Sequence, residues 1–286
     1  MKRIQWLASY PKSGNTWLRA FLANLLSDPS HPVDINRLDF APVAAARSLF
    51  DHAVGYEAAD LTFDEVDRLR PEVYAHYARQ AEDTIYLKVH DAYAHLPDGR
   101  PLIPADVTRG VIYVIRNPLD VCVSWAYHSG HENFDRAAAF MADPGACVAG
   151  NPGKCFPQLR QRLKSWSEHV LGWMASGLPV LGIRYEDMHR RPMETFAAVA
   201  AFVGKGDDPE RIARAVRFSD FGEMKRQERE HGFCEREAGT RTFFREGRIG
   251  GWRERLTEAQ AMRIIRDHGD VMRRFGYLTS TGEAVY

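Results

Sequence analysis

Residues 10–17, with the sequence YPKSGNTW, combine the groups that could hold a phosphate. An apolar run precedes them and apolar residues at helical spacing follow, so the pattern predicts a strand, a tight loop and a helix. Backbone N–H groups of such a loop point at an anion, and the helix start adds a partial positive charge. The side chains that could contact the anion, and the glycine that would let the backbone approach it, are Lys12, Ser13, Gly14, Asn15 and Thr16. An ordinary helix start, capped by Ser13 or Asn15, is the alternative for the same residues.

The loop does not have the spacing of the common ATP- and GTP-binding motif. A Walker A loop places four residues between its first glycine and a Gly-Lys-Ser/Thr ending. Here Lys12 precedes Gly14, the one glycine of the loop. We therefore expect a nucleotide phosphate as the ligand, but not ordinary hydrolysis of ATP or GTP.

Two later segments carry further anion-binding groups. In residues 116–128, RNPLDVCVSWAYH, Arg116 ends an expected buried strand and Ser124 lies on the next helix, which suits a bidentate grip on a phosphate. The alternative is an ion pair between Arg116 and Asp120, with Ser124 facing solvent. In residues 243–252, FFREGRIGGW, two arginines beside aromatic residues suit a loop that closes over an anion and a planar ring, or else a basic surface turn.

A lysine and a histidine end the second expected strand. Lys88 and His90 are two residues apart, so their side chains share one face of the strand and could share a reaction centre. An imidazole can accept a proton at neutral pH, and the pattern predicts His90 as a general base. A histidine that bonds a backbone carbonyl at the end of a strand is the alternative.

Strand and helix patterns alternate along the chain. Strands are expected at 3–9, 84–89, 110–115 and 179–184, and helices at 14–26, 118–127, 157–176, 192–204, 209–217 and 257–274. This order predicts an α/β fold, with a three-layer parallel β-sheet flanked by helices and a P-loop-like strand–loop–helix at its start. Ligands of such sheets bind beyond the carboxyl ends of the strands. The four strands are followed in turn by Lys12, His90, Arg116 and Tyr185.

The bulk composition indicates an ordinary globular chain. At 286 residues it suits a single domain, residues 1–286, with loop insertions at about 28–60, 128–156 and 222–250 that would form an acceptor pocket and lid. Its 38 basic residues equal its 38 acidic residues, so no global charge favours nucleic acid or an anionic membrane. No signal peptide, membrane span or metal-ligand spacing is visible, and the four cysteines lack CxxC spacing. We expect a cytoplasmic protein that needs no metal; the sequence leaves its oligomeric state open.

The three anion-binding segments, in this order, resemble the motifs of the sulfotransferases that use 3′-phosphoadenosine 5′-phosphosulfate (PAPS). The family's 5′-phosphosulfate loop reads YPKSGTTW, its 3′-phosphate segment roughly RNPKDVxVSxYH, and its late loop RxGxxGDW. The chain resembles the soluble, cytosolic-type branch and looks like a bacterial-like small-molecule sulfotransferase. The resemblance implies transfer of a sulfuryl group from PAPS to an acceptor hydroxyl, with His90 as base and adenosine 3′,5′-bisphosphate (PAP) as product. A small phenol or alcohol is the expected acceptor, while a sugar, a lipid or a protein tyrosine stays open.

The resemblance also assigns roles to the matching residues. The transfer itself would use Lys12, Lys88 and His90. The 5′-phosphate and bridging oxygens would contact Lys12, Ser13, Gly14, Asn15 and Thr16. The 3′-phosphate would contact Arg116 and Ser124, together with the late-loop positions Arg245, Glu246 and Gly247. The adenine would lie beside Trp17, Tyr185, Ser219 and Phe221.

Three positions depart from the family pattern, and two other functions stay open. Glu246 replaces a lysine and removes a cation near the 3′-phosphate, Gly251 replaces an aspartate that would pin the late loop, and Asn15 replaces a threonine. A nucleotide-dependent small-molecule kinase shares the strand–loop–helix, although the missing Walker ending disfavours it. A non-catalytic nucleotide-binding sensor is disfavoured by the intact Lys88 and His90.

Overall fold

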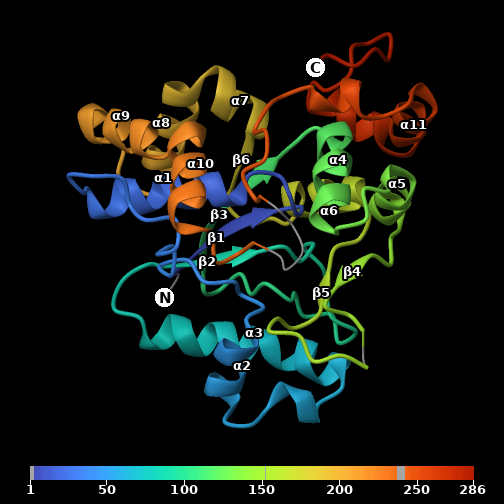
Figure 1. Ribbon diagram of the computed structural model, residues 1–286. Coiled ribbons are helices and arrows are strands. Elements are labelled where there is room, and N and C mark those ends of the chain that lie inside the picture. Colours follow the sequence, from blue (N-terminus) through green and yellow to red (C-terminus); the bar gives the residue numbers. More distant parts are fainter. Residues whose placement is uncertain (1–2, 152, 237–241) are drawn as a thin grey trace. The chain divides into compact units, whose positions relative to one another are not determined.

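A computed structural model describes residues 3–151, 153–236 and 242–286 (Figure 1). The chain forms two compact units. The first unit consists of residues 1–10, 41–113 and 143–182, and the second of residues 11–40, 114–142 and 183–286. The single domain expected over residues 1–286 stays a prediction.

A four-stranded parallel sheet, flanked by helices, is the centre of the fold. Its strand order is β2-β1-β3-β6, with bounds of Ile85–Val89 for β2, Ile4–Ser9 for β1, Thr108–Ile115 for β3 and Val180–Arg184 for β6. Every residue of β1 is buried, as expected for a central strand covered on both faces. Ile4 pairs with Ile85 and Ala8 with Val89, so β1 and β2 end at the same level. The predicted α/β fold with a parallel sheet is confirmed.

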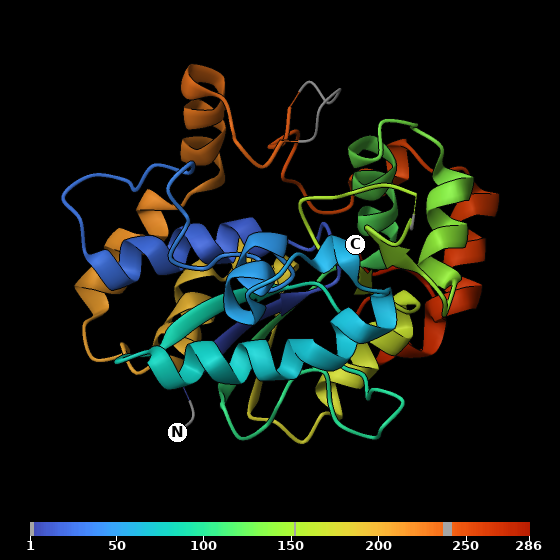
Figure 2. The same cartoon turned by 90° about the horizontal axis from the view of Figure 1, so that it is seen from below.

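The helices of the first unit include two, α2 (Arg47–Val54) and α3 (Phe63–Gln80), that the sequence patterns did not single out. The unit also contains a 3-10 turn (Ala58–Asp60) and α6 (Trp166–Met174). Figure 2 shows α3, in teal, as one continuous helix. A reciprocal capping box starts it, in which the Thr62 side chain accepts from the Glu65 N–H and the Glu65 side chain accepts from the Thr62 N–H. The spacing of Thr62 and Glu65 is the sequence signal for the start of α3.

The helix expected at 157–176 is shorter than the pattern predicted. Residues 161–162 instead form β5, which pairs antiparallel with β4 (Cys147–Val148). Lys164 has a φ of 56°, which no regular helix accommodates. Helix α6 begins after Ser165, whose side chain caps it in a box with Glu168. The local capping signal outweighed the helical spacing of the residues before it.

The second unit is mainly helical. Its helices are α1 (Asn15–Ser27), α4 (Pro118–His128), α5 (Phe134–Ala142), α7 (Tyr185–Arg190), α8 (Pro192–Phe202), α9 (Pro209–Phe218), α10 (Phe221–His231), a 3-10 turn (Gly251–Glu254) and α11 (Glu258–Arg274). Helices α4 and α5, in green, lie beside α11, in red, in both views (Figures 1 and 2). Phe21 of α1 stacks on Phe196 of α8 with ring centroids 4.2 Å apart.

The three insertions predicted as irregular contain regular elements. Helices α2 and α5 lie within 28–60 and 128–156, and most of α10 lies within 222–250. Residue 152 and residues 237–241 of these insertions lie outside the described residues. That the three insertions form an acceptor pocket and a lid stays a prediction. Among the described helices, none is long and apolar enough to cross a bilayer.

Candidate active site

The loop between β1 and α1 has an unusual backbone conformation. Lys12 has a φ of 66° and Gly14 a φ of 102°, both in the left-handed region. A Cβ on Gly14 would lie 2.5 Å from the ring of Tyr185, so only glycine fits there. Strained backbone of this kind in a non-glycine residue, as at Lys12, clusters at ligand sites. The predicted loop and the predicted adenine-side tyrosine therefore meet.

Ser13 of this loop has a buried hydroxyl. Its side chain is 1% exposed, and its hydroxyl has no hydrogen-bond partner among the residues that the structure describes. A buried hydroxyl without a partner is costly, so such groups call for a ligand or another explanation. A phosphate oxygen at the start of α1 would accept this hydrogen bond. The residues present thus fit the expected 5′-phosphate.

Arg116 joins the loop to Tyr185. Its Nη1 donates to the carbonyl of Lys12 at 2.9 Å, and its guanidinium lies 4.2 Å from the ring centroid of Tyr185. Trp17 meets the same tyrosine edge to face at 5.8 Å. Among the described residues, no ion pair joins Arg116 to Asp120, and the Asp120 carboxylate accepts from two backbone N–H groups. The first two motifs are therefore in contact through Arg116 and the Lys12 carbonyl, and the roles expected of their residues stay predictions.

Asp120 pins the late loop. Its two carboxylate oxygens accept from the N–H groups of Gly250 and Trp252, at 2.8 and 3.0 Å. The sequence patterns did not assign this role to Asp120, since the family-type aspartate is Gly251 here. A carboxylate from α4, 130 residues earlier in the chain, supplies the anchor instead.

Glu246 sits among arginines. Its carboxylate pairs with Arg245, with Arg248 at 2.8 Å and with Arg255 at 3.3 Å. Although partial burial favours the neutral acid, the charges of Arg245 and Arg248 hold the pKa of Glu246 below its usual value. Arg245, the cation of this loop that was expected at the 3′-phosphate, is thus paired with a carboxylate. The neighbouring Gly247 has no room for a side chain, because a Cβ would lie 2.3 Å from the ring of Phe221.

For the predicted nucleotide-side residues Ser219 and Ser124, the described part of the chain shows no side-chain contact with the other predicted residues. Ser219 is fully buried and its hydroxyl donates to the carbonyl of Ala215 at 2.8 Å. Ser124 is half-buried on α4. Their contacts with adenine and with the 3′-phosphate stay predictions.

Lys12, Arg116 and Trp17 each have a neighbour that the sequence did not predict. The Lys12 ammonium lies 4.2 Å from the ring centroid of Phe243, and the Arg248 carbonyl lies 3.5 Å from Nη2 of Arg116. The His189 ring lies 4.6 Å from that of Trp17. Burial, and then the charge of Arg116, lowers the pKa of His189 to about 4, so this ring is neutral at pH 7. Its spacing of one helical turn after Tyr185 was the available signal.

In the first unit, Lys88 is the penultimate residue of β2 and His90 directly follows the strand. The Lys88 N–H donates to the Pro42 carbonyl at 2.9 Å, and its carbonyl accepts from the Ala44 N–H at 2.7 Å. Nδ1 of His90 lies 2.8 Å from the Ser9 carbonyl oxygen. A carbonyl only accepts, so Nδ1 carries the proton and the lone pair of the neutral ring is on Nε2. The carbonyl contact of the alternative interpretation is therefore present, and it fixes the tautomer that a general base needs.

A second histidine holds the backbone of the first. Nε2 of His169 donates to the carbonyl of His90 at 2.9 Å, which leaves its Nδ1 to accept from the Tyr113 hydroxyl at 2.6 Å. The Tyr113 hydroxyl also interacts with the backbone of Tyr10, the first residue of the phosphate-type loop. His169 is fully buried, and burial lowers its pKa to about 4.

The depressed pKa of His169 predicts a pH-dependent loss of stability. The unfolded chain binds a proton to this ring below pH ~6.5 and the folded chain only near pH 4, so stability falls as the pH drops through that window. Chemical unfolding at pH 7 and pH 4.5 should show that wild type loses about 2 to 3 kcal/mol more than His169→Gln does. Equal losses for both proteins would contradict a buried, neutral His169.

Comparisons with known proteins agree with the motifs. The sulfotransferase domain family matches residues 3–276. Luciferin sulfotransferase of Photinus pyralis is 29% identical over 229 residues, which are 77% of this chain and 56% of that enzyme, so the match spans just over half of its length. Cytosolic sulfotransferase 12 of Arabidopsis thaliana is 27% identical, over 91% of this chain and 74% of that protein. The 3-alpha-hydroxysteroid sulfotransferase of Cavia porcellus is 28% identical, over 88% of this chain and 78% of that protein.

Solved structures support the fold. Mouse sulfotransferase SULT7A1, complexed with PAP, matches with a TM-score of 0.59 at 19% identity, over 99% of this chain and 87% of that one. Retinol dehydratase, in a complex with retinol and PAP, matches with a TM-score of 0.61 at 19% identity, over 96% of this chain and 82% of that one.

The family match covers residues 3–276, which is nearly the whole chain. It confirms the predicted class of enzyme, a sulfotransferase that uses PAPS as donor. This chain belongs to the sulfotransferase domain family.

Proposed function

We propose that this chain transfers the sulfuryl group of PAPS to a hydroxyl of a small-molecule acceptor, with His90 as general base. Arg116 is the observation that carries the proposal, because it ties the phosphate-type loop to Tyr185 through the Lys12 carbonyl and the tyrosine ring. A guanidinium in this place suits a second phosphate on the same nucleotide. A nucleotide with phosphates on both its 3′ and 5′ positions matches that requirement, whereas ATP does not.

Each part of the donor has residues of suitable chemistry. The 5′ end would be held by Lys12, Ser13, Gly14, Asn15 and Thr16. The 3′-phosphate would be held by Arg116 and Ser124, with Arg245 and Gly247 of the late loop. The adenine would be framed by Trp17, Tyr185, Ser219 and Phe221. Lys12 and the loop N–H groups would stabilise the negative charge that develops on the leaving phosphate oxygen.

The transfer is an in-line exchange at sulfur. A bond forms between the acceptor oxygen and sulfur while the bond from sulfur to the phosphate oxygen breaks, and that oxygen keeps the electron pair as PAP leaves. The acceptor proton goes to Nε2 of His90, the nitrogen that carries the lone pair when Nδ1 donates to Ser9. Lys88 would neutralise charge on the sulfuryl oxygens. By analogy with phosphoryl transfer, most of the acceleration comes from positioning and charge stabilisation.

The acceptor class is proposed from the relatives. Their names include a luciferin and a steroid sulfotransferase, so a phenol or an alcohol of small size is the first class to test. Purified protein with PAPS and a panel of phenols and alcohols should give products heavier by one SO₃ group in mass spectrometry. Transfer from ATP with magnesium, and none from PAPS, would favour the kinase. PAPS binding without product across the panel would favour the sensor. We also propose the cytoplasm as its location, which cell fractionation would test.

Glu246 is predicted to weaken donor binding. Its carboxylate competes with a 3′-phosphate for Arg245 and Arg248, and it repels the phosphate. Glu246→Gln should therefore bind PAP about three- to tenfold more tightly, with the gain shrinking at high salt. Glu254→Gln is the matched control, because Glu254 also pairs with Arg248 but is 64% exposed. Weaker PAP binding by Glu246→Gln would show that Glu246 instead holds the loop in its binding shape.

A further inference from the structure

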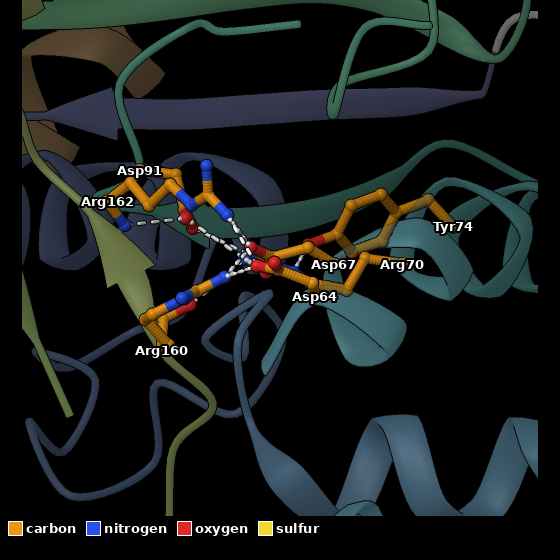
Figure 3. A network of polar contacts seen from close by, with 7 residues as sticks. All are labelled: Asp64, Asp67, Arg70, Tyr74, Asp91, Arg160 and Arg162. Carbon is orange, nitrogen blue, oxygen red and sulfur yellow. Dashed lines mark hydrogen bonds and ion pairs between the residues drawn. The ribbon is translucent and has the colours of Figure 1, made fainter. Parts of the chain in front are cut away.

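The residue that follows His90 is a buried aspartate in a dense polar network (Figure 3). Arg70, from α3, points its guanidinium at Asp91 and makes both hydrogen bonds of a fork, with Nη1 to Oδ1 at 3.0 Å and Nη2 to Oδ2 at 2.6 Å. The N–H of Arg162 donates to the same Oδ1 at 3.2 Å. Asp91 is fully buried and the side chain of Arg70 is 1% exposed.

Arg70 is itself fixed from other sides. Its Nε donates to the Tyr74 hydroxyl at 3.0 Å, and its Nη1 also donates to the Arg160 carbonyl at 3.1 Å. Burial would lower the pKa of Arg70, but the charge of Asp91 keeps it well above its usual value. Arg70 is therefore positively charged. Residues of α3 and of the segment around β5 fix the position of its guanidinium.

The backbone beside this pair is held as well. The indole N–H of Trp173 donates to the Asp91 carbonyl at 3.0 Å, next to the bond from His169 to the His90 carbonyl. The N–H of Ala92 donates to the Arg162 carbonyl at 2.8 Å. The backbone carbonyls of residues 90 and 91 thus each accept a hydrogen bond from a buried side chain. The Asp91 carboxylate accepts three further hydrogen bonds.

A buried ion pair is a poor way to gain stability, because desolvation offsets most of its attraction and apolar residues of the same size often do as well. What it does provide is one defined geometry, since a bidentate fork permits a single arrangement of its two partners. Here that geometry is imposed on the residue directly after the proposed base. A general base needs such placement, because a shift of 1 Å can cost about 10²-fold in rate.

We propose that Asp91, locked by Arg70, is a positioning residue that holds the His90 ring in place for proton transfer. This inference rests on the proposed function, in which His90 is the base. Asp91 does not touch the reacting atoms. It sets the backbone from which the His90 side chain extends, and with it the bond from Nδ1 to Ser9.

The test compares two buried carboxylates of the same network. Asp91→Asn keeps the size of the side chain and an acceptor for Arg162, but it breaks the charged fork. Asp67→Asn is the matched control, because Asp67 is also buried and lies 3.6 Å from Arg70, yet it belongs to α3 and not to the His90 segment. We expect kcat to fall about 10- to 100-fold in Asp91→Asn, with PAP affinity unchanged, and to stay near wild type in Asp67→Asn.

A spectroscopic measurement separates positioning from general damage. In ¹⁵N-histidine-labelled protein, the ring signals assigned to His90 by their loss in His90→Gln should show protonated Nδ1 in wild type and in Asp67→Asn. In Asp91→Asn the same signals should show mixed tautomers. If Asp91→Asn does not fold, the double variant Arg70→Met/Asp91→Asn removes the unpaired charge and should show the same loss of kcat and of tautomer purity.

The outcomes distinguish the inference from the function on which it rests. Full activity of Asp91→Asn, beside an inactive His90→Ala, would overturn the positioning role and leave the function intact. Equal losses of kcat in Asp91→Asn and Asp67→Asn, with the His90 tautomer unchanged in both, would also overturn it. No turnover in wild type, or an active His90→Ala, would instead contradict the proposed function.

Discussion

His90→Ala is expected to lower kcat by about 10²- to 10⁴-fold, the usual loss when a general base is removed. Affinity for PAP should stay close to that of wild type, because His90 lies on the β2 segment and not among the residues expected to hold the nucleotide. Initial rates with a saturating alcohol acceptor, together with a PAP titration, measure both quantities. His95→Ala is the matched control, since His95 is an exposed histidine of the same segment.

Acceptor acidity gives the same prediction a second readout. An acidic phenol is already ionised at neutral pH and needs no base, so His90→Ala should lose much less rate with it than with an alcohol. Wild-type turnover of an alcohol by His90→Ala would remove His90 from the mechanism. An equal loss with both acceptors would show that His90 acts by something other than proton transfer.

Arg116→Ala is expected to abolish most of the preference for nucleotides that carry a 3′-phosphate. Charge-assisted hydrogen bonds to a phosphate contribute about 1.5–3 kcal/mol, so the ratio of Kd values for the 3′-hydroxyl and 3′-phosphate nucleotides should fall roughly 10- to 100-fold. Titration of both nucleotides into the variant and wild type gives the two ratios. Arg109→Ala is the matched control, because Arg109 lies at the other end of β3 and donates to Thr84.

The ratio of the two Kd values decides whether Arg116 contacts the 3′-phosphate. Because its Nη1 also supports the Lys12 carbonyl, Arg116→Ala should weaken both nucleotides to some extent. The ratio isolates the 3′-phosphate from this general effect. An unchanged ratio would mean that Arg116 supports the loop without contacting the 3′-phosphate.

The structural features that the sequence predicted correctly are those that depend on residues close together in the chain. The four strands of the sheet, the loop at residues 10–17 and the helix starts at Pro118 and Pro209 follow from local hydrophobic periodicity and turn chemistry. The helix over 157–165 was wrong, because pairing of β5 with β4 and the cap at Ser165 outweighed the spacing of apolar residues.

Contacts between distant residues were not predictable from one sequence. Asp120 pins a loop 130 residues later, and no local pattern connects these two segments. Arg70 and Asp91 come from α3 and from the end of β2, so the charged fork exists only once both are folded. The resemblance suggested which residues react, and that stays a proposal, whereas the contacts between distant side chains required the structure.

Every role proposed for these residues depends on donor binding, and titration calorimetry with PAP measures that binding. Wild type should give a saturable heat with one site per chain, and a markedly weaker interaction with adenosine 5′-monophosphate, which lacks the 3′-phosphate. No heat from PAP with well-folded protein, or equal affinity for the two nucleotides, would contradict these roles.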